Sequence, residues 1–188
     1  MSRHKLKMLN ENQRRQLLKL ARTSIESVLS GGSPAISESE FDETLRTPAG
    51  AFVTLRTKRG DLRGCIGSIR AIEPLWRAVV SSALSAAFRD PRFMPVRHDE
   101  MSTLELEISV MGPIELVRAT EEIDVGRDGL IISRGRYAGL LLPQVATEYG
   151  WDRQTFLDQT CIKAGLEPGA WRNEQTRIEK FSAEVFAE

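Results

Sequence analysis

The first regular pattern along the chain is an amphipathic helix from Asn10 to about residue 30. Its apolar positions recur at helical spacing, at Leu17, Leu20, Ala21, Ile25 and Val28. Asn10 and Gln13 fit an N-cap and its capping-box partner, two side chains that satisfy free amide groups of the first turn. The Gly-Gly-Ser-Pro run at 31–34 ends this helix. The polar stretch that continues to Pro48 predicts a loop with little regular structure.

Alternating side chains then predict an antiparallel hairpin. In residues 51–57, Phe52, Thr54 and Arg56 alternate with apolar residues, and a Lys-Arg-Gly-Asp turn leads to a second extended segment at 62–69. Pro74 suits the first turn of a helix with a broad face of small apolar residues. Asp90 and Pro91 end that helix.

The second half of the chain repeats the theme of strands and short helices. Residues 104–110 alternate apolar and polar positions, as a strand with one buried face does. A second hairpin spans 129–142, Pro143 opens a helix that Gly150 caps, and Asp152 starts another that Gly165 caps. A last strand is expected at 178–186. Long separations between short strands favour an α+β fold, with helices packed on an antiparallel or mixed sheet.

Composition narrows the classes of partner. The 188 residues carry 26 Lys and Arg and 26 Asp and Glu, so no net field attracts nucleic acid or an anionic membrane. There is no apolar run long enough to span a bilayer and no signal-type segment after the basic residues at the start. The pattern is typical of a cytoplasmic protein, in which Cys65 and Cys161 stay reduced.

Seven short motifs carry a resemblance to a known family, the AMMECR family. The first is LRGCIG at residues 62–67, and the others follow in the family's order. They are Ala86-Ala87 with Asp90-Pro91-Arg92-Phe93, Glu107-Ile108-Ser109-Val110, Gly126 with Asp128-Gly129-Leu130, Leu142-Pro143-Gln144-Val145-Ala146, Gly150-Trp151, and Lys163-Ala164-Gly165-Leu166. The resemblance identifies residues 1–188 as a single AMMECR domain. The motifs lie within 49–188, and the helix at about 10–30 is expected to pack on that region.

The resemblance implies more than the patterns do. It implies an α+β domain with a larger and a smaller lobe and a cleft between them, edged by a loop at Leu62–Gly67. It also implies a place in the AmmeMemoRadiSam system, beside a Memo-like protein and a radical S-adenosylmethionine protein. It does not imply a reaction, and whether the chain is an enzyme stays open.

Cys65 is the principal candidate for chemistry. If residues 62–66 are extended, Arg63 and Cys65 share one face, so a guanidinium group would lie beside the thiol and favour the thiolate. Gly64 and Gly67 would let a ligand or another backbone approach closely. In the competing interpretation, Cys65 is a small buried hydrophobe and the glycines accommodate the helix after Pro74.

Other polar residues have equally ordinary alternatives. Glu107 is a tentative acid or base, or part of a solvated strand face. Gln144 is a tentative ligand contact, or a cap for its own helix. Lys163 is a tentative cleft residue, or a charge that complements a helix dipole. Asp90 and Arg92 either face a ligand or form a rigid helix stop.

Several kinds of site are not indicated. The histidines offer no base for Cys65, since His4 lies near the terminus and His98 is expected on the surface. No sequence motif for a metal or a nucleotide is present, so no metal and no cofactor is predicted. Cys161 lies at the inward spacing of its helix and is expected in the core. Arginines near the second hairpin are expected in a solvated turn, which makes nucleic acid an unfavoured partner.

Two functions follow from these residues. In the first, the chain is an accessory or catalytic component that acts through Cys65 and Arg63, with Glu107 and Lys163 as cleft residues. In the second, it is a non-catalytic module whose glycines at 64 and 67 receive a partner's backbone or a ligand, and Cys65 matters only through its size. Regulatory binding of nucleic acid is a weaker third.

Overall fold

The computed structural model describes residues 8–188 and divides the chain into two compact units. The larger unit runs to Met111 and includes the C-terminal residues Glu184–Glu188. The smaller unit is Gly112–Ala183. Both combine helices with antiparallel strands, which confirms the predicted α+β class.

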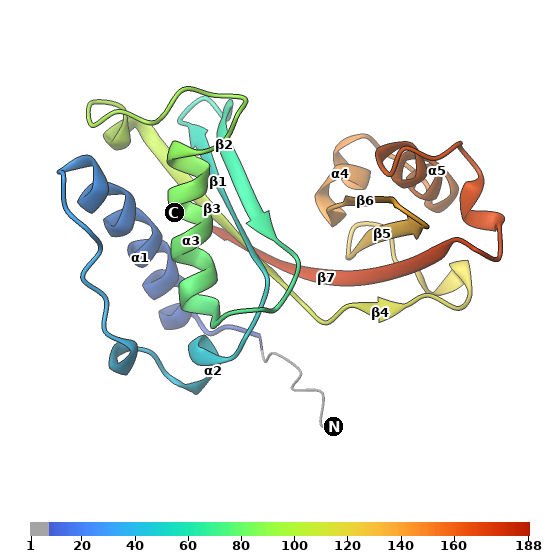
Figure 1. Ribbon diagram of the computed structural model, residues 1–188, viewed down its shortest axis with the longest axis horizontal. Helices are drawn as coiled ribbons and strands as arrows, with labels where there is room; N and C mark the ends of the chain where they lie inside the picture. Colours follow the sequence, from blue (N-terminus) through green and yellow to red (C-terminus); the bar gives the residue numbers. More distant parts are fainter. Residues whose placement is uncertain (1–7) are drawn as a thin grey trace. The chain divides into compact units, whose positions relative to one another are not determined.

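The sheet of the larger unit has β1 (Ala51–Thr57) between β2 (Leu62–Ser68) and β3 (Leu104–Met111). Both pairs are antiparallel. Helices α1 (Glu11–Leu29) and α3 (Leu75–Phe88) lie along one face of this sheet (Figure 1). The hairpin and the strand at 104–110 are therefore confirmed.

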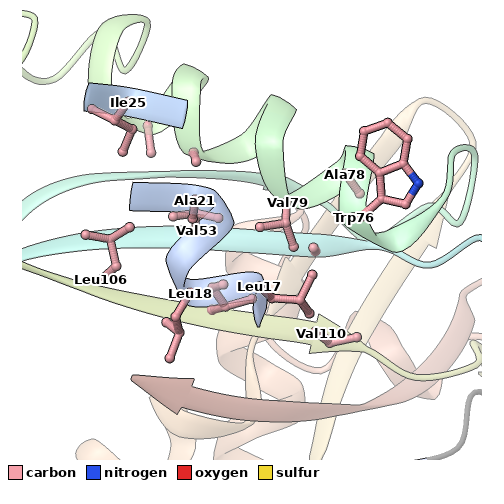
Figure 2. Packing of buried hydrophobic residues seen from close by; sticks show 14 of the residues in the cluster. Leu17, Leu18, Ala21, Ile25, Val53, Trp76, Ala78, Val79, Leu106 and Val110 are labelled. Carbon is pink, nitrogen blue, oxygen red and sulfur yellow. The ribbon is translucent and has the colours of Figure 1, made fainter. Parts of the chain in front are cut away.

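Alternation decides which residues of the sheet meet the helices. Val53 and Leu106 point from the strands toward Leu17 and Ala21 of α1 and Val79 of α3 (Figure 2). All five side chains are fully buried. Strand residues that directly precede or follow Val53 or Leu106, such as Thr54, point to the opposite face of the sheet.

The capping box of α1 is formed as predicted. The side chain of Asn10 accepts a hydrogen bond from the amide of Gln13 at 2.9 Å, and the side chain of Gln13 accepts one from the amide of Asn10 at 2.8 Å. Pro74 occupies the N-cap position of α3, one residue before the first turn in which it was expected.

The prediction of a loop from 34 to 48 was wrong in part. A 3-10 turn covers Glu38–Glu40, and the short helix α2 covers Glu43–Arg46. The carboxylate of Asp42 accepts the amide of Leu45 at 3.0 Å, and Leu45 is fully buried. Phe41 stacks on Trp76 of α3 with ring centroids 5.0 Å apart. Tertiary packing orders this segment, which has no periodic pattern of its own. A further 3-10 turn, Met101–Thr103, precedes β3.

In the smaller unit, β5 (Asp128–Arg134) lies between β6 (Tyr137–Leu141) and β7 (Arg177–Ala187). The two-residue strand β4 (Glu115–Leu116) pairs with β7. Helices α4 (Pro143–Glu148) and α5 (Arg153–Lys163) pack on this sheet. Short 3-10 turns cover Thr120–Glu122 and Ala170–Arg172. Strand β4 was not predicted because two exposed residues give no pattern.

Helix ends in the smaller unit follow the predicted signals. Pro143 opens α4, and the Asp152 side chain caps α5 by accepting the amide of Thr155 at 2.7 Å. Gly150 and Gly165 have φ of 63° and 78°, left-handed values that glycine adopts without steric cost.

Strand β7 passes from one unit to the other along the sequence, since its residues to Ala183 belong to the smaller unit and those from Glu184 to the larger. Glu188, which follows it, donates its amide to the carbonyl of Leu106 at 3.1 Å. The guanidinium group of Arg22 pairs with the carboxylate of Glu188. Among the helices that the structure describes, none combines the length and the apolar character needed to cross a membrane.

Candidate functional site

Strand register places three polar side chains in one row across the larger unit's sheet. Thr54 of β1 lies opposite Cys65 of β2 on one side and opposite Glu107 of β3 on the other. Residues directly opposite on antiparallel strands have Cβ atoms about 5 Å apart and point to the same face. We call Cys65, Thr54 and Glu107 the thiol row. It lies on the sheet face that α1 and α3 leave uncovered.

The middle residue of the thiol row binds the thiol. The Thr54 hydroxyl donates a hydrogen bond to Cys65 Sγ over 3.2 Å. Thr54 is 6% exposed, and Cys65 and Glu107 are half-buried. The thiol is therefore held on the sheet by a side chain from the neighbouring strand.

The segment that carries Cys65 is a strand and not a loop. Residues 62–67 fall inside β2, at the edge of the β2-β1-β3 sheet. The Cys65 amide donates to Asp90 Oδ2 at 2.9 Å, and the Cys65 carbonyl accepts from Arg92 Nη2 at 3.1 Å. Both backbone groups of Cys65 therefore bond to side chains from the segment after α3. These bonds fix the strand at the thiol.

Asp90 and Arg92 form the ion pair behind these contacts. Asp90 Oδ1 accepts hydrogen bonds from Arg92 Nε at 2.9 Å and from the Arg92 amide at 3.1 Å. Asp90 Oδ2 accepts one from Arg92 Nη2 at 2.7 Å. The Asp90 side chain is 1% exposed, whereas that of Arg92 is 53% exposed. Hydrogen bonds from Arg92 hold the pKa of Asp90 well below its usual range. The Asp90 carboxylate is therefore engaged within the protein, just after the end of α3 at Phe88.

Arg63 has a different partner from the expected one. Its Nη2 donates to Glu100 Oε2 at 2.8 Å, and the guanidinium group lies 6.0 Å from the centroid of the Phe93 ring. The guanidinium group that contacts Cys65 belongs to Arg92, through the backbone carbonyl. Arg63 Nη1 is buried and has no hydrogen-bond partner among the described residues.

The two glycines beside Cys65 are packed against the protein's own chain. A Cβ atom on Gly64 would lie 2.3 Å from the Ala86 carbonyl oxygen of α3. A Cβ atom on Gly67 would lie 2.4 Å from the ring of Phe52 and 2.3 Å from a β1 carbonyl. Accommodation of the helix after Pro74 thus explains Gly64, and a neighbouring strand explains Gly67.

Gln144 and Lys163 belong to the smaller unit, whereas the thiol row belongs to the larger. Gln144 does not cap α4, whose N-cap is Leu142 with no side-chain bond, so the capping alternative was wrong. Its Oε1 atom is buried and lacks a partner among the described residues. Lys163 is exposed in the last turn of α5, where its charge complements the helix dipole. Ligand binding by either residue stays a prediction.

The remaining candidates behave as ordinary structural residues. Cys161 is fully buried, and burial raises the pKa of its thiol. It lies in the core of the smaller unit, as expected. His98 is exposed. In residues 8–188, no group of three or more His, Cys, Asp or Glu side chains could hold a metal ion. The absence of a metal cofactor remains a prediction.

Two residues of the site were missed or undervalued in the sequence. Thr54 reads as an ordinary strand threonine, and only the pairing of β1 with both neighbours places it between Cys65 and Glu107. Arg92 follows Asp90 by two positions, a spacing that suggests a local ion pair but not a contact with β2. That contact joins residues 27 positions apart.

Comparisons with known proteins agree on one family. The model of the AMMECR1 family matches residues 18–186. A protein of Pyrococcus furiosus is 45% identical over 92% of this chain and 86% of its own length. A protein of Methanothermobacter thermautotrophicus is 43% identical over 96% of each chain. The crystal structure of an uncharacterized protein from Pyrococcus horikoshii superimposes with a TM-score of 0.85, at 44% identity, over 92% of this chain and 90% of that one.

Proposed function

The chain belongs to the AMMECR1 family, and we propose that it is a thiol-dependent component, enzyme or accessory, whose reacting group is Cys65. The observation that carries the proposal is the hydrogen bond from the Thr54 hydroxyl to Cys65 Sγ at 3.2 Å. A thiolate, and not a thiol, is the nucleophile in cysteine chemistry. The Thr54 hydroxyl, held in place by the sheet, is therefore proposed to be the donor that stabilises the thiolate of Cys65.

The other members of the site receive roles from their positions. Glu107 ends the thiol row, two strands from Cys65, and is proposed to exchange a proton with a part of the ligand that lies away from the thiol. Asp90 and Arg92 hold the backbone of Cys65 through its amide and carbonyl. Arg63, which pairs with Glu100, is proposed to add positive charge near the ligand, and not to act as a partner of the thiol.

The geometry gives less support to the non-catalytic alternative. That alternative needs open space at Gly64 and Gly67, so that a partner's backbone or a ligand can approach. Both positions are filled, by the Ala86 carbonyl and the Phe52 ring respectively. A module that binds through some other surface is a separate hypothesis, and none of these contacts favours it.

The cellular setting is proposed from the family resemblance. A cytoplasmic location would keep Cys65 reduced. The resemblance to the AMMECR family further suggests that the protein acts with a Memo-like protein and a radical S-adenosylmethionine protein. A pull-down of the wild-type chain and of the Cys65→Ser variant from cells that contain both proteins would test that association.

Replacing Thr54 by valine tests the proposed activation of the thiol. We expect the rate of Cys65 alkylation by iodoacetamide at neutral pH to fall about fivefold, because a hydrogen bond of this kind contributes about 1 kcal/mol. The rate is measured in the folded protein by mass spectrometry of the peptide that contains Cys65. Thr57→Val, the same change three positions along β1, is the control and should leave the rate unchanged. Equal rates in wild type and Thr54→Val would contradict the proposal.

A further inference from the structure

Two guanidinium groups lie against one aromatic ring next to Cys65. Arg63 Cζ is 6.0 Å and Arg92 Cζ is 5.5 Å from the centroid of the Phe93 ring. Arg63 precedes Cys65 by two positions on β2, and Arg92 donates to the Cys65 carbonyl. We call Arg63 and Arg92 the arginine pair. Its members are anchored to the strand segment that carries the thiol.

The arginine pair keeps donors that the fold does not use. The side-chain hydrogen bonds of Arg92 come from Nε and Nη2, which bind Asp90 and the Cys65 carbonyl. Its Nη1 donates to no group within the described part of the chain, residues 8–188, and the side chain is 53% exposed. Arg63 uses Nη2 for Glu100, while its Nη1 is buried without a partner in residues 8–188. A buried, unpaired N–H of a charged group is costly.

The surrounding charges decide where an acceptor would bind. Asp90 and Glu100 are each engaged by one member of the arginine pair. Glu107 is the carboxylate of the thiol row; it is two strands from Cys65 and therefore about 10 Å away. An anion would be repelled at the Glu107 end of the row. It would be attracted at the exposed edge of Arg92, where guanidinium N–H groups match an oxyanion.

We infer that the arginine pair recognises the anionic group, a carboxylate or a phosphate, of the molecule that meets Cys65. The inference rests on the proposed function, since it names the class of substrate for the same thiol. Arg92 contacts the anion because its side chain is half-exposed. Arg63, which is mostly buried, adds positive charge beside it. The Phe93 ring is an apolar support for both guanidinium groups.

Two alkylating reagents that differ in charge test this inference. Iodoacetate and iodoacetamide react with a thiolate in the same way: a bond forms from sulfur to the methylene carbon, and iodide leaves with the electron pair of the carbon–iodine bond. One reagent carries a carboxylate and the other is neutral. The ratio of their rates at Cys65 therefore reports anion recognition, because changes in thiol reactivity affect both reagents and largely cancel.

We expect the iodoacetate-to-iodoacetamide ratio in the folded protein to exceed that of the unfolded chain by about tenfold, the lower end of what a focused positive potential achieves. Arg92→Gln should return the ratio close to the unfolded value, and Arg92→Lys should keep part of the preference through its charge. Arg63→Gln, which leaves the Asp90 contacts intact, should lower the ratio by a smaller factor. Arg97→Gln removes an exposed arginine of the same segment and should change nothing.

Competition identifies the anion. Inorganic phosphate and acetate are added separately at constant ionic strength, and the stronger protector against iodoacetate marks the preferred group. Protection by neither, or a folded ratio equal to the unfolded one while iodoacetamide still labels Cys65, overturns the inference and leaves the proposed function standing. If neither reagent labels Cys65 in the folded protein, the proposed function itself fails, and the inference fails with it.

Discussion

Gly64→Ala is expected to destabilise the larger unit by about 3 kcal/mol or more, the upper range for overpacked interiors. The new methyl carbon would lie 2.3 Å from the Ala86 carbonyl oxygen and 3.1 Å from its carbonyl carbon. Both atoms belong to the backbone of α3, so no side chain can rotate away and β2 must separate from the helix. Urea unfolding followed by circular dichroism measures the change.

Gly60→Ala is the matched control for this substitution. Gly60 lies in the turn between β1 and β2 with φ of 89°, and nothing lies within 4 Å of the added Cβ atom. Only the left-handed backbone opposes alanine there, at about 1 kcal/mol. Similar losses in the two variants would show that the contact with α3 does not restrict residue 64.

Asp90→Asn is expected to cost about 2 kcal/mol at neutral pH, since charge-assisted hydrogen bonds to Arg92 and the Cys65 amide are lost or weakened. The pKa of Asp90 is held below its usual range in the folded protein, so its stabilisation is complete above the unfolded value of about 3.9 and is lost as pH falls through the folded value. The difference in unfolding free energy between wild type and variant should therefore be constant from about pH 7 to 5 and shrink below about pH 4.

Asp99→Asn serves as the comparison for Asp90→Asn. Asp99 also pairs with an arginine, Arg97, but both side chains are exposed, at 66% and 73%. Solvent screens such pairs, so this variant should unfold like the wild type. A pH-independent effect of Asp90→Asn would show that its role is steric and not electrostatic.

Local signals in the sequence were sufficient for most of the fold. Capping residues such as Asn10 and Asp152 and alternation in β1, β2 and β3 depend on neighbours a few positions away, so they are readable without tertiary structure. Helix α2 and strand β4 were missed for the converse reason. Leu45 is ordered by packing in the core, and β4 by pairing with a strand more than 60 positions later.

The candidate site was predictable only in part, because its contacts are long-range. The importance of residues 62–67 was inferred from a family resemblance. The glycines beside Cys65 suggested that the thiol is open to a ligand, but the structure explains both glycines by packing within the protein. Thr54 became visible through strand register, and Arg92 through a contact across 27 positions. No periodicity or spacing in a single sequence encodes either relationship.

The central claim, that Cys65 is an accessible reacting thiol, is tested most directly by labelling the folded wild-type protein with iodoacetamide and locating the label by mass spectrometry. Cys65 is half-buried and Cys161 is fully buried. Labelling of Cys161 in the same sample therefore serves as the control for labelling of Cys65. We predict labelling at Cys65 alone in the folded protein and at both cysteines after unfolding. Protection of Cys65 until the protein unfolds would contradict the account and make this cysteine a packing residue.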